Sequence, residues 1–263
     1  MNKKDKKSLL IEYLENAQKE VLVTELVEKL NISDVSVRRY LRELNDQGVI
    51  TRTHGGAKIR KNGDTDNSDV FEYPLEFRKV INVAEKRKIC KYAASLINDG
   101  DTIFVDNSST TSFLLEYINP NYSISFISNS FNLLLKALEI KNPNFTFISL
   151  GGTFCTTPNF SFYGVTTIEH AKNYYPVKAF YSCAALRADG IMTDIGLVES
   201  DIKKVMIGRS VENYFLIDHS KFDLQCQIYI ASLKDNLKII MDDELSERDK
   251  DIVNRWGDKI KLV

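Results

Sequence analysis

The chain has 263 residues, 43% of them hydrophobic and 27% charged, with only 12 glycines and 5 prolines. This composition excludes collagen-like, disordered and low-complexity proteins, because ample apolar material is present to form a core, and the length is enough for two domains. The formal net charge of −1 is uneven, since residues 1–60 carry 12 Lys and Arg against 9 Asp and Glu, whereas residues 61–263 carry 23 against 27. A basic end of this kind hints at a nucleic-acid partner.

Metal, cofactor and membrane signals are not found in the sequence. The four cysteines are at least 28 residues apart, which excludes a C-x-x-C zinc or redox pair, and we expect them to fill core space. They are Cys90, Cys155, Cys183 and Cys226, and the three histidines, also scattered, are His54, His170 and His219. The first ten residues lack the apolar run of a signal peptide and no 18-residue apolar segment occurs. We therefore expect a cytoplasmic protein with no metal, no cofactor and no membrane contact.

The first sixty residues predict three helices followed by a β-ribbon. Apolar residues recur at helical spacing through residues 4–16, 25–30 and 34–45, and Thr24 and Ser33 are expected to cap the second and third helices. Residues 49–54 and 57–59 have strand composition on either side of Gly55-Gly56. Three helices and a ribbon outline a winged helix-turn-helix, which we assign to residues 1–59.

Residues 60–75 have the Asn-, Asp-, Gly- and Ser-rich composition of a linker, and strands alternate with helices after it. The expected strands are 102–106, 123–127, 145–150, 178–181, 214–218, 228–230 and 237–241, with helices at 85–97, 112–117, 131–138 and 202–211. Near-continuous apolar strands separated by helices predict a mainly parallel sheet covered on both faces. The expected fold class is thus an α+β winged helix-turn-helix followed by an α/β domain at residues 76–263. The charged tail 242–263 suggests no function.

The third helix carries the candidate DNA-reading residues. If Val37, Leu41 and Leu44 face the core, the three arginines of this helix project from its other faces, where Arg can bond guanine or hold a phosphate. Serines at the helix N-terminus suit phosphate or base-edge hydrogen bonds. The expected DNA-binding residues are Ser33, Ser36, Val37, Arg38, Arg39 and Arg42 on the helix, with Arg52 and His54 near the ribbon turn. Lys3, Lys4, Lys6 and Lys7 are expected to form a mobile basic arm. The alternative is an ordinary solvated helix face.

Two motifs make the DNA-binding interpretation specific. They are Ser33-Asp34-Val35-Ser36-Val37-Arg38-Arg39-Tyr40-Leu41 and Arg52-Thr53-His54-Gly55-Gly56-Ala57. With them, residues 5–57 resemble the N-terminal domain of the DeoR family of bacterial transcriptional regulators. Family sequences usually have Asp at the position of Tyr40, a change that we expect to alter one side-chain contact while the arginines remain. The resemblance implies that Arg38 and Arg39 contact operator DNA.

A second candidate site lies where strands of the α/β region end. Asp106-Asn107-Ser108-Ser109-Thr110-Thr111 joins a strand to a helix, and hydroxyls with free N–H groups at a helix N-terminus bind anions, phosphate above all. Polar loops that follow other strands are Ser128-Asn129-Ser130, Gly151-Gly152 and Asp218-His219-Ser220-Lys221, the last with a lysine to match a phosphate charge. Ligands of parallel sheets bind at the C-terminal ends of the strands, so four such loops favour a ligand site over simple helix capping.

These loops resemble the effector domain of the same family, which shares its fold with ribose-5-phosphate isomerase and related CoA transferases. Ser108 replaces the more common glycine of the family's Asp-x-Gly/Ser-x-Thr-Thr loop, residues 183–191 depart from its Ser-Gly-Ile-Asp pattern, Gly164 and Glu199 match, and the Asp-x-Ser-Lys motif is intact. The resemblance implies a ribose-5-phosphate-isomerase-like domain that binds a phosphorylated sugar. The residues expected to bind it are Asp106, Ser108, Ser109, Thr110, Thr111, Asn129, Gly151, Gly152, Glu199 and Lys221.

The function implied is a DNA-binding repressor of carbohydrate-metabolism genes, modulated by a phosphorylated sugar, with double-stranded operator DNA as its partner. Helix-turn-helix proteins commonly read two half-sites, so we expect a homodimer or homotetramer. One alternative is a sugar-phosphate isomerase-like enzyme, but such isomerases use Asp-Gly-Ala-Asp where this chain has Arg187-Ala188-Asp189-Gly190, and we expect no catalysis. The other alternative is a constitutive DNA-binding protein with a degenerate sensor domain.

Overall fold

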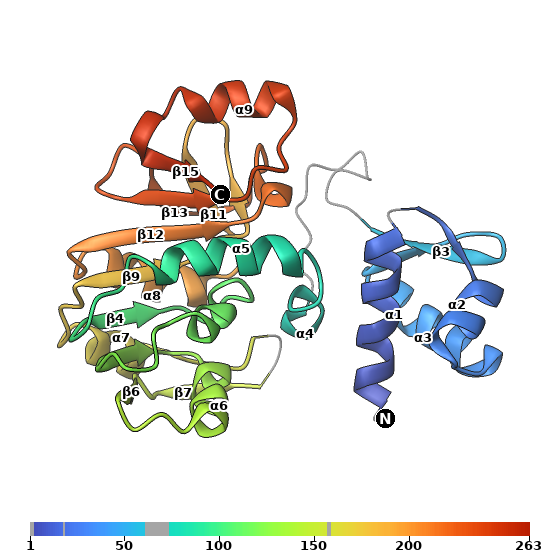
Figure 1. The fold of residues 1–263 in the computed structure, drawn as a ribbon, viewed down its shortest axis with the longest axis horizontal. Coiled ribbons are helices and arrows are strands. Elements are labelled where there is room, and N and C mark those ends of the chain that lie inside the picture. Colours follow the sequence, from blue (N-terminus) through green and yellow to red (C-terminus); the bar gives the residue numbers. More distant parts are fainter. Residues whose placement is uncertain (1–2, 18, 61–73, 157–158) are drawn as a thin grey trace. The chain divides into compact units, whose positions relative to one another are not determined.

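The structure, a computed structural model, describes residues 3–17, 19–60, 74–156 and 159–263 (Figure 1). The chain divides into two compact units, Met1–Val83 and Ala84–Val263. Residues 61–73, most of the expected linker, lie outside the described residues. The expected second domain starts at residue 76, but residues 76–83 belong to the first unit because Phe77 is buried in its core and Val80 and Ile81 pack against that core.

The first unit is a winged helix-turn-helix. Its helices are α1 (Lys3–Ala17), α2 (Val23–Leu30), α3 (Asp34–Asp46) and the short α4 (Leu75–Arg78). The wing strands β2 (Ile50–Arg52) and β3 (Gly56–Ile59) are antiparallel, and β3 also pairs with β1 (Val21–Leu22), a strand that the sequence did not predict. A Cβ atom at Gly56 would overlap the carbonyl oxygen of Val21, so a glycine is needed where these two strands pair.

Two helix starts in this unit test the expected caps. Ser33 is the N-cap residue of α3, as expected, although its hydroxyl donates to the Ser36 hydroxyl (2.9 Å) and accepts no hydrogen bond from a backbone N–H of the described helix. Thr24 is not a cap. Because Val21 and Leu22 pair with β3, the chain passes directly from strand to helix, α2 begins at Val23, and Thr24 lies inside its first turn.

A seven-stranded parallel sheet forms the centre of the second unit, in the order β15-β14-β12-β9-β4-β5-β6 (Figure 1). The strands are β4 (Thr102–Val105), β5 (Ile124–Ser128), β6 (Phe145–Ser149), β9 (Lys178–Tyr181), β12 (Glu212–Ile217), β14 (Lys238–Met241) and β15 (Ile260–Leu262). The predicted mainly parallel sheet is therefore confirmed. Residues 228–230 belong to β13 (Ile228–Ser232), which lies outside this sheet and pairs antiparallel with β11 (Ile191–Asp194), itself paired with β10 (Ala185–Leu186).

Helices lie on both faces of the sheet, with α5 across the face in view in Figure 1. They are α5 (Val83–Ala94), α6 (Phe131–Ile140), α7 (Val165–Ala171), α8 (Leu197–Ile207) and α9 (Glu247–Asn254), and residues 111–116 form a 3₁₀ helix in place of the expected α-helix. The strands β7 (Thr153–Cys155) and β8 (Ser161–Tyr163) pair as an antiparallel ribbon. The tail contributes α9 and β15, so it is an integral part of the sheet and its cover.

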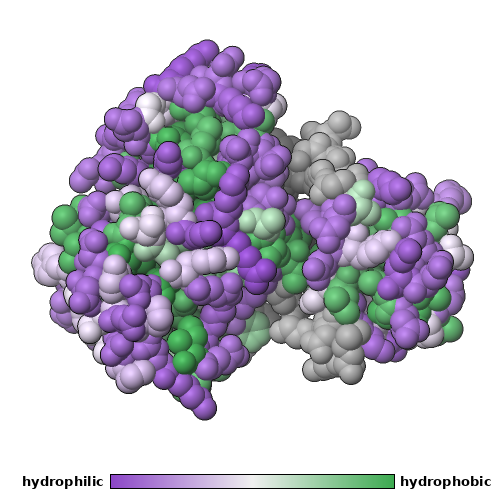
Figure 2. Space-filling model, in the orientation of Figure 1, coloured by the Kyte–Doolittle hydropathy of each residue, from purple (hydrophilic) through white to green (hydrophobic). Residues whose placement is uncertain are grey.

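The core of the second unit is built around the central strands. Phe104 of β4, Tyr181 of β9 and Phe215 of β12 are fully buried, and their rings contact one another with centroid distances of 5.6 and 5.2 Å. Such buried aromatic pairs add to the free energy of burial. On the face shown in Figure 2, hydrophilic residues predominate and hydrophobic residues form smaller patches. The rigid strands position the loops at their C-terminal ends, where the second candidate site lies.

Candidate DNA-binding and effector sites

The outer face of α3 is cationic. Val37, Tyr40, Leu41 and Leu44 are buried against the core of the first unit, whereas Arg38, Arg39 and Arg42 are exposed. This matches the expected arrangement with one exception. Val37 was expected among the DNA-binding residues, but its side chain is fully buried, so it holds the helix in place and cannot touch a base edge.

Two of the arginines form ion pairs with neighbouring side chains of the same helix. Arg38 Nε donates to Asp34 Oδ1 at 2.7 Å, and Arg39 lies 3.9 Å from Glu43 Oε1. The Arg39 guanidinium also lies over the ring of Tyr40, 5.0 Å from its centroid, which is the contact that a tyrosine at this position provides. Exposed ion pairs of this kind are weak, so both arginines can exchange these partners for phosphates or bases at little cost.

The wing is joined to the end of α3. The Arg52 amide donates to Asn45 Oδ1 at 3.2 Å, and the Thr53 amide donates to the Gly56 carbonyl at 3.1 Å across the turn. The side chains of Arg52 and His54 are exposed. Residues 3–7, expected as a mobile arm, instead form the first turns of α1, where Lys7 Nζ pairs with Glu43 Oε2 at 2.5 Å.

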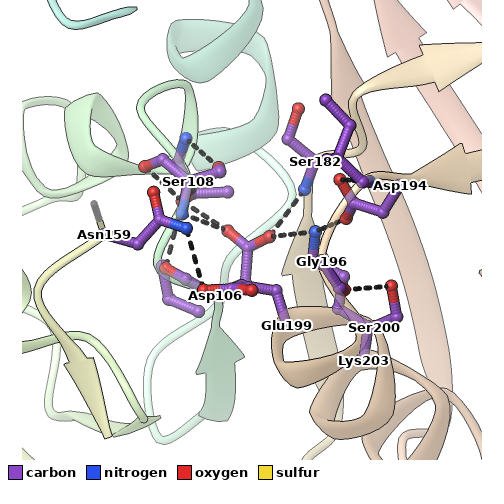
Figure 3. A network of polar contacts seen from close by, with 12 residues as sticks. Asp106, Ser108, Asn159, Ser182, Asp194, Gly196, Glu199, Ser200 and Lys203 are labelled. Carbon is purple, nitrogen blue, oxygen red and sulfur yellow. Dashed lines mark hydrogen bonds and ion pairs between the residues drawn. The ribbon is translucent and has the colours of Figure 1, made fainter. Parts of the chain in front are cut away.

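Asp106, directly after β4, organises the polar loop 106–111 (Figure 3). Its Oδ1 accepts hydrogen bonds from the Ser108 amide (3.0 Å) and the Thr111 hydroxyl (2.7 Å). Its Oδ2 accepts from the amide of Ser182, at the end of β9, at 2.9 Å. One buried carboxylate therefore holds this loop to the neighbouring strand.

A buried lysine that the sequence did not single out neutralises this carboxylate. Lys203 of α8 donates to Asp194 Oδ2 at 2.6 Å and lies 3.7 Å from Asp106 Oδ2, with all three side chains at most 7% exposed (Figure 3). Burial lowers the pKa of Lys203, but Asp194 and Asp106 outweigh it, and the net shift is upward. The lysine is therefore charged throughout the neutral range. Nothing in the local sequence pattern marks Lys203, because the partners that define it lie on other elements.

Lys221 is brought to the same place through Ser182. Its ammonium donates to the Ser182 hydroxyl at 2.9 Å and lies 4.0 Å from Asp218 Oδ2. The loop after β4 and the loop after β12, both predicted from sequence, thus meet at one serine that sequence reasoning missed. Lys221 retains a partly exposed side chain, so its charge is accessible from solvent.

Several polar atoms around this edge of the sheet are buried without a hydrogen-bond partner among the described residues. They are Thr110 Oγ1, Asn129 Oδ1 and Ser161 Oγ, with Asn132 Nδ2 at the start of α6. Native proteins pair nearly all such atoms with protein groups, ordered water or a bound molecule. Thr111, by contrast, is engaged with Asp106 and Ser108, and it shapes the loop.

Glu199 and the paired glycines have structural roles that the sequence did not reveal. Glu199, in the first turn of α8, accepts a hydrogen bond from Asn159 Nδ2 at 2.8 Å (Figure 3). Gly151 and Gly152 both have positive φ, and a Cβ atom at Gly152 would overlap the Thr167 hydroxyl, which donates to the Gly151 carbonyl at 2.6 Å. The glycines shape the turn after β6 so that α7 packs against it.

The remaining titratable groups near the site are structural. His219 bonds Asp242 Oδ2 through Nδ1 (2.7 Å), and this hydrogen bond raises the pKa of His219 above its ordinary value. Its contribution to stability is therefore complete below its unfolded-state pKa and is lost as pH rises through the raised value. Cys90, Cys183 and Cys226 are buried, as expected, and the Cys90 thiol donates to the Thr110 carbonyl at 3.1 Å, whereas Cys155 is half-buried. The described residues hold no cluster of metal-ligating side chains.

Family models match both parts of the chain. Residues 7–62 match the DeoR-like helix-turn-helix domain, and residues 81–243 match the DeoR C terminal sensor domain. These two matches define a DNA-binding transcriptional regulator with a sensor domain. The chain belongs to the DeoR family.

Curated relatives cover most of the chain. A lactose phosphotransferase system repressor of Staphylococcus aureus is 32% identical over 89% of this chain and 90% of its own length. The proteins of the same name from Staphylococcus epidermidis and Streptococcus mutans are 34% and 33% identical over 84% and 78% of this chain, and over 84% and 79% of their own lengths.

Solved structures that resemble the chain do so more distantly. Ribose 5-phosphate isomerase A from Methanocaldococcus jannaschii has a TM-score of 0.39 and 19% identity over 54% of this chain and 55% of its own. Translation initiation factor eIF-2B from Pyrococcus horikoshii has a TM-score of 0.39 and 15% identity over 85% of this chain and 74% of its own. No helix in the described part of the chain is long and apolar enough to cross a membrane.

Proposed function

We propose that this protein represses carbohydrate-metabolism genes by binding operator DNA through α3 and the wing, and that a phosphorylated sugar bound in the second unit releases it. The observation that carries the DNA half is the outer face of α3, where three exposed arginines lie opposite four buried apolar residues. The relatives named lactose phosphotransferase system repressor support the sign of regulation and the link to carbohydrates.

In the DNA complex, α3 enters the major groove, where arginine forks match guanine and phosphate oxygens. Arg38, Arg39 and Arg42 supply these contacts. Ser33 and Ser36, at the N-terminal turn, donate to phosphates or base edges, and Arg52 and His54 reach the neighbouring backbone from the wing. A homodimer or homotetramer in the cytoplasm places two such helices on successive half-sites.

The effector half rests on the meeting of two loops at Ser182. The Lys221 ammonium holds the phosphate together with hydrogen-bond donors of loop 106–111, since a charge-assisted bond to phosphate is among the strongest available. The unpaired Thr110 Oγ1 and Asn129 Oδ1 then receive sugar hydroxyls, which both donate and accept hydrogen bonds. Ser108, Ser109, Gly151, Gly152 and Glu199 complete the set proposed to line the site.

Release follows from a population shift. A ligand changes an equilibrium only to the extent that it binds one state better than the other. We propose that sugar phosphate favours an arrangement whose paired α3 helices no longer match the operator spacing. The contacts of α8, through Lys203 to Asp106 and through Glu199 to Asn159, support α8 as the element that responds to the bound ligand.

Catalysis is not part of the proposal. In the turn between β10 and β11, where an isomerase needs paired carboxylates, Asp189 is exposed and ion-paired with Arg187 at 2.7 Å. The Asp189 carboxylate is therefore engaged in an ion pair on the surface. Isomerisation of ribose 5-phosphate by the purified chain would contradict this part of the proposal.

The direct test is a gel-shift on DNA from upstream of the chain's own gene, with and without a panel of sugar phosphates. We expect a retarded protein–DNA complex that at least one sugar phosphate dissociates, while the corresponding unphosphorylated sugar leaves it intact. A complex that no sugar phosphate affects, together with no thermal stabilisation by any of them, would favour a constitutive DNA-binding protein with an empty sensor domain.

Replacing Lys221 by methionine should remove the response to effector and leave operator binding intact. Loss of one charge-assisted hydrogen bond to phosphate corresponds to an increase of about 10- to 100-fold in the effector concentration needed for half-release. The measurement is a titration of the gel-shift complex with the effector. Lys238→Met is the matched control, because Lys238 is exposed at the amino end of β14, the opposite edge of the same sheet. An unchanged titration for Lys221→Met would remove this lysine from the site.

A further inference from the structure

The most outward position on the first turn of α3 holds a valine. Val35 is the second residue of the helix, and 78% of its surface is exposed. A β-branched residue is a poor helix former, and here it gains nothing from the core. Isolated exposed apolar residues are common, so exposure alone decides nothing. The position of Val35 relative to its neighbours on α3 is what suggests a function.

Val35 shares its face with the arginines. At about 100° per residue, positions 35, 39 and 42 fall within one narrow sector of the helix, directly opposite Val37, Tyr40, Leu41 and Leu44. Arg39 and Arg42 follow Val35 at one and two turns, and both are exposed. Two methyl groups thus stand at the N-terminal end of a cationic face.

The acidic residue beside Val35 does not make this end of the helix repel DNA. Asp34 accepts the 2.7 Å hydrogen bond from Arg38 Nε, so Arg38 can keep this pair and compensate the charge of Asp34 while its two Nη groups contact DNA. The N-terminal residues of a recognition helix are the ones that contact base edges. Val35 is therefore the side chain that enters the groove first among those of the outward sector.

The major groove offers one apolar group that matches such a side chain. Each base pair presents donors and acceptors there, and only thymine adds a methyl group, at C5. We propose that Val35 packs against a thymine methyl in each operator half-site and so specifies a T·A pair at one position. This inference rests on the proposed insertion of α3 into the major groove and adds a sequence preference to it.

The test uses a duplex selected by the full-length protein from a randomised library, in which each thymine in turn is replaced by deoxyuridine. The replacement removes only the C5 methyl. For the unaltered protein we expect one position per half-site where Kd rises about fourfold, the value for exposing one buried methyl group. For Val35→Ala, Kd on the thymine duplex rises by a similar factor, and deoxyuridine at that position adds no further loss.

Leu22→Ala is the matched control, because Leu22 is an exposed apolar residue of β1 in the same unit and lies outside α3. It should keep the full deoxyuridine effect at the same position. The inference is overturned if Val35→Ala and the unaltered protein show the same ratio of Kd values at every thymine. If arginine substitutions on α3 still weaken binding in that case, the DNA-binding proposal stands and only the valine contact fails. If those substitutions have no effect, both fail.

Discussion

Replacing Lys203 by methionine lowers the free energy of unfolding of the second unit by about 3–5 kcal/mol, the usual result of removing one partner of a buried ion pair. The substitution leaves the carboxylates of Asp106 and Asp194 buried near each other without a cation. The measurement is urea unfolding followed by tryptophan fluorescence. The sequence contains one tryptophan, Trp256, which packs against the core of the second unit, so the signal reports this unit alone.

Lys204→Met is the matched control. Lys204 is the next residue of α8, it is exposed, and its ammonium lies 4.0 Å from the Asp201 carboxylate in a surface ion pair, so we expect a change within about 0.5 kcal/mol. Equal effects of the two substitutions would show that the buried cluster contributes nothing to stability.

Replacing both Arg38 and Arg39 by alanine weakens operator binding by at least about 30-fold, since each arginine at a base or phosphate contributes about 1–3 kcal/mol. The loss arises in binding and not in folding, because both side chains are more than half exposed and their ion pairs are weak. Gel-shift titrations at several salt concentrations measure it. If either arginine contacts a phosphate, the slope of log K against log salt also falls, by about one for each such contact.

The control for the arginine pair is Arg248→Ala with Arg255→Ala, two exposed arginines on and directly after α9 of the second unit. This variant removes the same formal charge. We expect its operator affinity to stay within about twofold, because these arginines belong to the second unit, which supplies none of the proposed DNA contacts. Equal affinity losses in the two double variants would mean that overall charge, and not the outer face of α3, determines binding.

Hydrophobic periodicity predicted the fold correctly for those elements that bury an apolar face of their own. The stripe of α3 and the apolar strands of the parallel sheet were visible because each repeats within one segment. The elements that failed depend on distant partners. β1 is two residues long and exists through its pairing with β3, which also displaced the expected cap at Thr24. Residues 228–230 look like any buried strand, and only the position of β11 places them outside the main sheet.

The same distinction applies to the candidate sites: residues defined by their local sequence were predicted, and residues defined by distant partners were missed. Motif residues were predicted correctly as loop positions at strand ends, because turn and cap chemistry is local. Val37 was wrongly predicted to contact DNA, because its position in the apolar stripe of α3 buries it. Lys203 and Ser182 were missed since each acquires its role from residues tens of positions away, Asp106 above all. The core location of Phe77 likewise follows from α1 and not from its own segment.

Ser182 joins the two halves of the proposed effector site. Its amide holds the Asp106 carboxylate and its hydroxyl holds the Lys221 ammonium. A ligand therefore does not have to order two separate loops, and the conformational entropy of bringing them together is lost during folding, not during binding. Preorganisation of this kind leaves more of the interaction energy of a small, highly hydrated molecule available to favour one state of the regulator over another.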